Sequence, residues 1–178
     1  MVFLHKFGLK RISREPPPLD QLNGRYRTAF DAATTNDPIK LIAGAREFLD
    51  NVTGSFHVVF ATGSLAYGAM IKLSLLERSM DNSAVVTASE FQTREDIVEQ
   101  AVRRGCKAVN LRSPNRIISI GDGVWDLKTA DNLGYEFIGI GDGAKAVALK
   151  DMGARVFVDF TAVYRILGSN LTANSPVG

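Results

Sequence analysis

The stretch IISIGDGVWDLKTA, residues 117–130, joins a run of β-branched residues to a helical pattern through the turn GDG. The apolar run is typical of a buried strand, and the residues after Gly123 have helical spacing. Asp122 directly follows the predicted strand and Asp126 lies in the first turn of the predicted helix, so both carboxylates can face one space. Two hard oxygen donors suit Mg²⁺ better than zinc. Alternatively, Asp122 caps the helix and Asp126 stabilises its positive N-terminus; the residues alone leave both interpretations open.

Short apolar runs alternate with helical patterns along most of the chain. The sequence predicts strands at residues 56–64, 83–89, 115–123, 136–141 and 154–160, with helices between them at residues 65–79, 93–105, 125–134 and 144–153. Such alternation is typical of right-handed βαβ units. We therefore expect an α/β fold with a Rossmann-like parallel sheet, helices on both faces, and ligands at the carboxyl ends of the strands.

Two further helices are predicted before the first strand. Residues 22–33 have helical spacing, and Pro38 ends the connection that follows. In the next helix, five apolar residues lie on one face and Gly54 takes the C-cap position. These five are Ile42, Ala45, Phe48, Leu49 and Val52.

The opening residues, 1–20, are basic but lack the sustained apolar run and cleavage site of a secretory signal. We predict a short amphipathic helix with Phe3, Leu4 and Phe7 turned inward, in preference to a transit peptide. The prolines at 16–18 then mark a linker or a corner.

The composition limits the partners that can be expected. The chain has 178 residues, with 21 Lys and Arg against 19 Asp and Glu, and a net charge of +2 gives no reason to expect nucleic acid or a lipid surface. No stretch reaches the roughly 18 to 20 apolar residues of a membrane span. The single cysteine, Cys106, cannot form an internal disulfide, and no His and Cys cluster has zinc spacing. We therefore expect a cytoplasmic protein with no membrane or nucleic-acid partner.

A second set of polar groups follows the strand that ends in ATGS, residues 61–64. Thr62 and Ser64 carry hydroxyls, and the backbone amides from Gly63 onward start a helix, where a phosphate binds readily. Lys72 lies on that helix and could place its ammonium near the anion, although a solvated lysine is the commoner case. The two strand ends together predict one pocket for phosphate and Mg²⁺.

These residues resemble the motifs of the haloacid dehalogenase (HAD) superfamily of hydrolases, most of which are Mg²⁺-dependent phosphatases. The resemblance runs from about Ala43 to Leu167: VVFATGS is similar to motif II, AMIKL to motif III and ISIGDGVWD to motif IV. NLGYEFIGIG is similar to the stretch that follows motif IV in a phosphoglycolate-phosphatase-like branch. The resemblance implies a phosphoric monoester hydrolase that acts on a small phosphorylated metabolite.

The resemblance also implies roles for single residues. Thr62 would hold the transferring phosphoryl oxygen, Lys72 would stabilise its charge, and Asp122, with Asp126, would hold Mg²⁺. Residues 1–37 are similar to the last part of the helical cap that these enzymes insert after their first strand. The expected division is therefore a cap remnant at residues 1–37, an α/β core at 38–168 and a flexible tail at 169–178.

The nucleophile of this family is not found. Its enzymes attack phosphorus with an aspartate of a D-x-D-x-T motif that follows a hydrophobic first strand, and the sequence contains no such motif. The nearest string, FDAATT, offers Asp31 and Thr35 but has Ala33 in place of the second acid, and a poor strand precedes it. Without a nucleophile no phosphoenzyme can form.

In the family the missing first strand is central, between the strands of motifs II and IV, so its loss leaves a gap among buried backbone groups. Either the neighbours close up, or the N-terminal MVFLHKF occupies the gap, or the protein begins further upstream. The incomplete sheet favours the last, so we expect a truncated or inactive hydrolase. An unfilled gap could promote association, but the sequence predicts no oligomeric state.

Two other functions compete with a hydrolase. A pseudoenzyme that binds phosphate and Mg²⁺ without chemistry is favoured by the missing nucleophile. A dinucleotide-binding domain is suggested by glycines at 139, 141 and 143 and by Asp159 near the end of the next strand, but the spacing is G-x-G-x-G and only one strand follows. Arg94 is expected in an exposed ion pair with Glu95, Asp96 or a neighbouring helix.

Overall fold

The structure, a computed structural model, describes residues 19–78 and 82–172. The predicted N-terminal amphipathic helix and the proline corner lie outside these ranges. The helices are α1 (Leu19–Asn36), α2 (Ala45–Val52), α3 (Ala66–Ser74), α4 (Arg94–Ala108), α5 (Val124–Leu133), α6 (Gly143–Asp151) and α7 (Val163–Thr172), with a 3₁₀ turn η1 (Asn82–Ala84). The strands are β1 (Phe60–Thr62), β2 (Val85–Thr87), β3 (Ile118–Gly121), β4 (Glu136–Ile140) and β5 (Arg155–Phe157).

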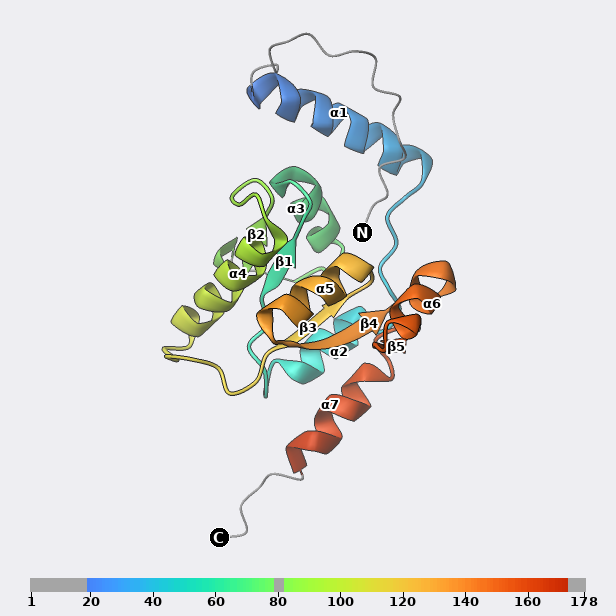
Figure 1. Cartoon of the computed structure of the whole chain (residues 1–178). Helices are drawn as coiled ribbons and strands as arrows, with labels where there is room; N and C mark the ends of the chain where they lie inside the picture. Colours follow the sequence, from blue (N-terminus) through green and yellow to red (C-terminus); the bar gives the residue numbers. More distant parts are fainter. Residues whose placement is uncertain (1–18, 79–81, 173–178) are drawn as a thin grey trace.

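Every strand pair in the described chain is parallel. β1 pairs with β2, and β3, β4 and β5 pair in that order, with Ala61 opposite Val86 and Ile120 opposite Ile138. Strands alternate with helices from β1 to α7 (Figure 1). The predicted α/β class is therefore confirmed, and each predicted strand is present, although shorter than its apolar run.

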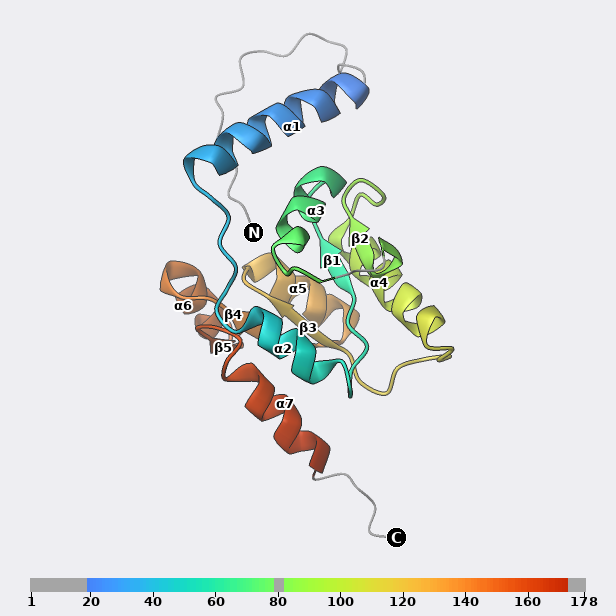
Figure 2. The ribbon, with the colours of Figure 1, turned by 180° about the vertical axis from the view of Figure 1, so that it is seen from behind.

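Helices cover both faces of the strands, as predicted. α4 contacts β1 and β2, α5 contacts β3 and β4, and α6 contacts β5. α2 and α7 contact each other on the opposite face, which is turned to the viewer in Figure 2. None of the helices in the described ranges is long and apolar enough to cross a lipid bilayer.

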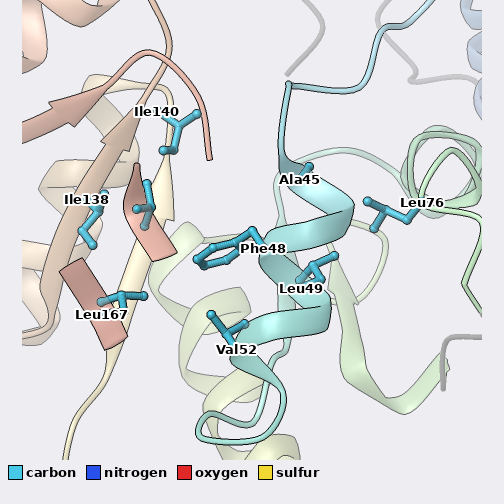
Figure 3. Close-up of a cluster of buried hydrophobic side chains, with 9 residues drawn as sticks. Ala45, Phe48, Leu49, Val52, Leu76, Ile138, Ile140 and Leu167 are labelled. Atoms are coloured by element: carbon cyan, nitrogen blue, oxygen red, sulfur yellow. The ribbon is translucent and has the colours of Figure 1, made fainter. Parts of the chain in front are cut away.

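The larger hydrophobic cluster lies under α2. Phe48 and Val52 point toward Ile138 and Leu167, and Leu76 lies on the other side of the helix, near Ala45 (Figure 3). The predicted apolar face of this helix is confirmed with two corrections. Ile42 is 42% exposed because the helix begins only after Gly44, and the C-cap is Thr53 rather than Gly54.

α7 was not predicted, yet its Val163 and Leu167 are buried in the same cluster. The helix continues to Thr172, past the predicted core boundary at residue 168. The C-terminal helix is thus part of the core packing.

α1 stands apart from the strands and touches the rest of the protein at α3 (Figures 1 and 2). Phe30 is buried and its ring packs edge-on against Tyr67, with the ring centroids 6.0 Å apart. Asp31, the closest match to a nucleophile in the sequence, accepts a hydrogen bond of 2.8 Å from the Tyr67 hydroxyl. The string FDAATT is therefore helical and joins α1 to α3 rather than following a strand.

The two groups of strands do not pair with each other among the described residues. β1 and β3 instead line one cavity of about 140 Å³. The gap predicted between the strands that end in ATGS and GDG is thus present, and the possibility that these two strands close up is wrong.

Candidate functional site

The ATGS turn after β1 forms a short hydrogen-bonded chain. The Ser64 backbone N–H donates to Thr62 Oγ1 at 3.1 Å, and Lys72 Nζ donates to Ser64 Oγ at 2.9 Å. The Ala88 N–H donates to the Ser64 carbonyl at 3.2 Å, which ties this turn to the end of β2. The predicted Thr62, Ser64 and Lys72 are therefore brought together at the carboxyl end of β1.

The GDG turn after β3 carries two carboxylates, and each accepts from a cation. Lys145 Nζ donates to Asp122 Oδ2 at 2.9 Å, and Arg94 donates to Asp126 Oδ1 at 2.6 Å. Asp126 Oδ2 also accepts from the backbone N–H of Gly123 at 3.1 Å. Asp126 thus stabilises the start of α5, as the alternative interpretation expected, but the N-cap residue is Gly123, so the capping role considered for Asp122 is wrong.

The two turns are close enough to interact electrostatically. Burial lowers the pKa of Lys72, and the negative charge of Asp122 partly opposes this shift. The hydroxyl and lysine of one turn and the carboxylates of the other therefore share one edge of the fold.

Burial also raises the pKa of Asp126, and the charge of Asp122 adds to the increase. The Arg94 guanidinium and the Gly123 N–H act in the opposite direction, but burial outweighs them. A short ion pair would by itself lower this pKa, so the net increase reflects how far the carboxylate is withdrawn from water. Its side chain is 22% exposed.

The donor set at this edge fits Mg²⁺. Mg²⁺ in proteins is commonly held by one or two carboxylates, with water and substrate phosphate completing its octahedron. Asp122 and Asp126 can supply the two carboxylates once Lys145 and Arg94 yield to the metal. Within residues 19–78 and 82–172, no group of three or more His, Cys, Asp or Glu side chains could bind a metal ion, so no third ligand of these types joins them.

Two cations contact the acids of the site. Of the partners expected for Arg94, the structure shows the one on a neighbouring helix, Asp126 of α5. Lys145 was not singled out at all. A usable signal lies in the topology, because Arg94 starts α4 after β2 and Lys145 lies in the first turn of α6 after β4, at the same carboxyl edge.

The glycines that suggested a dinucleotide site have structural explanations. At Gly141 and Gly143 the explanation is a positive φ, of +138 and +63, since nothing lies within 4 Å of a Cβ built at either position. Gly139 lies within β4, where a Cβ would come within 2.9 Å of the Val156 side chain, so close packing accounts for it. Asp159 accepts hydrogen bonds from the backbone N–H and the hydroxyl of Thr161 in the turn before α7.

No family model and no curated protein matches the sequence. Solved structures do match. A hydrolase from Pseudomonas syringae aligns with a TM-score of 0.65 and 20% identity over 84% of this chain and 69% of its own. A protein assigned as a beta-phosphoglucomutase from Bacteroides vulgatus aligns with a TM-score of 0.63 and 17% identity, covering 88% and 64%.

A conserved haloacid dehalogenase-like protein of unknown function from Agrobacterium tumefaciens aligns with a TM-score of 0.62 and 17% identity, covering 88% of this chain and 72% of its own. The chain thus spans between 64% and 72% of the length of these three proteins. At these identities the matches show a shared fold and not a shared activity. The chain has the haloacid dehalogenase-like fold.

Proposed function

We propose that the carboxyl edge of this fold binds the phosphate group of a small phosphorylated metabolite together with Mg²⁺, and that the protein is a phosphoric monoester hydrolase. The observation that carries the proposal is the bond between Lys72 and Ser64 beside Thr62, within electrostatic reach of Asp122. The hydrolase part rests on the fold shared with the Pseudomonas syringae hydrolase and on the motif resemblance.

The phosphate would lie on the ATGS turn. Thr62 and Ser64 supply hydroxyls, and Lys72 supplies a positive charge. The backbone N–H groups of Ser64 and Ala66 already donate to Thr62 Oγ1 and Ser89 Oγ, so a phosphate would compete with these bonds for the amides. Because Lys72 is partly buried, water screens its attraction to a bound phosphate less than it would at a solvated lysine.

Asp122 and Asp126 would hold Mg²⁺. The bound metal would supply charge neutralisation at the phosphoryl oxygens. Lys145 and Arg94, which now pair with the two acids, would hold the carboxylates in place when the metal is absent and keep two like charges from repelling each other.

A second candidate, phosphate and Mg²⁺ binding without hydrolysis, is favoured by one observation. In the described part of the chain no group of three His, Cys, Asp or Glu side chains could hold a metal ion, so no further side chain of these types joins Asp122 and Asp126 as the nucleophile. Hydrolysis through an aspartate of the family's D-x-D-x-T kind would need that aspartate from outside the described residues.

One titration separates these possibilities. Trp125 is the chain's only tryptophan, and its ring centroid lies 5.6 Å from the Arg94 guanidinium, so its fluorescence should report on ligands at this edge. Inorganic phosphate and Mg²⁺ should change the emission, and Lys72→Met should weaken phosphate binding by about tenfold. Lys128→Met, on the exposed side of α5, is the matched control.

Release of phosphate from p-nitrophenyl phosphate should then be measured with Mg²⁺. Turnover that is lost in Asp122→Asn supports the hydrolase, whereas binding without turnover supports the second candidate. If neither phosphate nor Mg²⁺ changes the fluorescence or the thermal stability, both functions are wrong.

A further inference from the structure

The outer edge of β2 is covered by side chains rather than by a strand. Among the described residues β2 pairs with β1 alone, so no further strand lies along its other side. Its three residues, Val85, Val86 and Thr87, are nonetheless all buried. A strand of β-branched residues with an open edge is a ready site for pairing with another chain, so the way this edge is covered matters.

Two residues of β2 turn their backbone groups away from β1. Just beyond the strand, the Ala88 N–H donates to the Ser64 carbonyl on the β1 side at 3.2 Å. Backbone groups alternate in direction along a strand, so Val86 faces β1 as Ala88 does. Val85 and Thr87 therefore face outward. A further parallel strand would bind the carbonyl of Val85 and the N–H of Thr87 through a single residue of its own.

Arg104 and Glu90 occupy both of these groups. Arg104 donates through one guanidinium nitrogen to the Val85 carbonyl at 2.9 Å, and the Thr87 N–H donates to Glu90 Oε1 at 3.3 Å. The other guanidinium nitrogen donates to the second carboxylate oxygen of Glu90. The ion pair thus offers the edge one donor and one acceptor, as one residue of a neighbouring parallel strand would.

The position of Arg104 follows from the buried face of α4. Ile97 and Ala101 are 2% and 1% exposed and pack against Val86 of β2. Arg104 lies on the same helical face, at i+7 from Ile97 and i+3 from Ala101. Its apolar stem continues this face and its head reaches the edge of the strand, where the side chain is 27% exposed.

The neighbouring ion pair on α4 is an ordinary surface pair. Arg103 and Glu99 lie one helical turn apart and join at 3.4 Å along the helix. Arg104 and Glu90, by contrast, are 14 residues apart, and they come from α4 and from the turn after β2. The two pairs have the same residue types but different surroundings, which makes the first a matched control for the second.

We propose that Arg104 and Glu90 stand in for a residue of a neighbouring strand and keep the edge of β2 from pairing with a second copy of this chain. Without them, two copies would meet through the same strand about a twofold axis, with Val85 of one copy opposite Thr87 of the other. The inference stands apart from the proposed function, since it concerns the outer edge of the sheet and not the ligand site.

Removal of the ion pair tests the proposal. In Arg104→Met/Glu90→Ala both covering groups are lost, while residue 104 keeps an apolar stem. We expect the average mass measured by sedimentation to rise about twofold with protein concentration, because a second copy is the smallest unit that can be added. Arg103→Met/Glu99→Ala should keep the wild-type mass at every concentration.

Hydrogen exchange identifies the surface through which the copies meet. In dilute solution the Thr87 amide of the double variant should exchange faster than in wild type. As the concentration rises its exchange should slow, because the second copy then covers it, and the amides of β4 should show no such dependence. Association without slower exchange at Thr87, or a folded variant that keeps the wild-type mass, would overturn the proposal.

Arg104→Met alone provides a milder test. It uncovers the Val85 carbonyl and leaves the bond between Thr87 and Glu90 in place, so the rise in mass should be smaller than in the double variant. If the double variant does not fold, the single variant decides. A folded Arg104→Met protein with an unchanged mass would then contradict the inference.

Discussion

Asp126 has several hydrogen bonds, a candidate role in metal binding and a partly buried position. It accepts from Arg94 and from the Gly123 N–H, it is a candidate Mg²⁺ ligand, and it is largely withdrawn from water. Burial raises its pKa despite the guanidinium beside it. The protonation state of Asp126 therefore depends on its surroundings, as its position does.

The first prediction concerns pH. Because the folded-state pKa of Asp126 lies above its ordinary value of 3.8, this carboxyl regains its proton earlier than an unperturbed aspartate as the pH falls. As the pH is lowered, we expect Mg²⁺ binding, measured by Trp125 fluorescence, to be lost before the pH reaches 3.8. By the same linkage, wild-type stability relative to Asp126→Asn should fall as the pH rises from 3.8 through the raised pKa. A pH-independent difference in stability would contradict this.

The second prediction concerns Arg94. Arg94→Met leaves the Asp126 carboxylate without its guanidinium, so we expect the free energy of unfolding to fall by about 1 kcal/mol. Urea denaturation at neutral pH measures the change. Arg103→Met is the matched control, because Arg103 is 71% exposed and lies 3.4 Å from Glu99 on the same helix. Equal losses of unfolding free energy in the two variants would mean that the contact with Asp126 stabilises the protein no more than an exposed ion pair does.

At the scale of elements, apolar runs located the strands but overstated their lengths. The run that begins at Phe56 predicted a strand to Ser64, whereas β1 is Phe60–Thr62, because β2 offers partners only at residues 85–87. A strand ends where its hydrogen-bonding neighbour ends, and a single sequence does not show which strand that neighbour is. α7 was not predicted, although its buried residues Val163 and Leu167 have helical i, i+4 spacing. The contact with α2 is what shows this face to be part of the core.

The candidate site was predictable in part. Thr62, Ser64 and Lys72 lie on one strand–helix unit, so their contact follows from local spacing. Lys145 and Arg94 reach the acids from other helices. Such pairs depend on which helices lie side by side, which becomes visible only when the strand order is known.

The third prediction tests one helix end. Gly134 ends α5 with φ +70, in the left-handed region, and nothing lies within 4 Å of a Cβ built there. Gly134→Ala should therefore cost about 1 kcal/mol of stability through backbone strain alone. Gly54→Ala, which meets no atom within 4 Å and lacks a positive φ, should be neutral or slightly stabilising. Thermal denaturation of both variants separates strain from crowding, and equal effects would contradict the assignment.

At the scale of the whole molecule, the attachment of α1 depends on one close approach. A Cβ at Gly68 would lie 2.3 Å from the Tyr26 hydroxyl and 2.8 Å from the Phe30 ring. Gly68→Ala should therefore release α1 from α3 and leave the strands folded, although alanine is otherwise favoured inside a helix.

Limited trypsinolysis measures this fourth prediction. Cleavage after Lys40, between α1 and α2, should be faster in Gly68→Ala than in wild type, with the thermal midpoint of the core unchanged. Gly24→Ala, on the open side of α1, is the control and should be cut at the wild-type rate. Equal cleavage of wild type and Gly68→Ala would show that α1 does not depend on this contact.

The unpaired edges of β1 and β3 divide the described strands into two hydrogen-bonded groups, and the candidate site lies across the gap between them. Thr62 and Lys72 lie at one group, and Asp122 and Asp126 at the other. The hydrophobic cluster under α2 and the pair of Arg94 with Asp126 join the two groups. Phosphate bound together with Mg²⁺ would add one more link across the gap, so the thermal midpoint of the whole described core should rise with phosphate concentration.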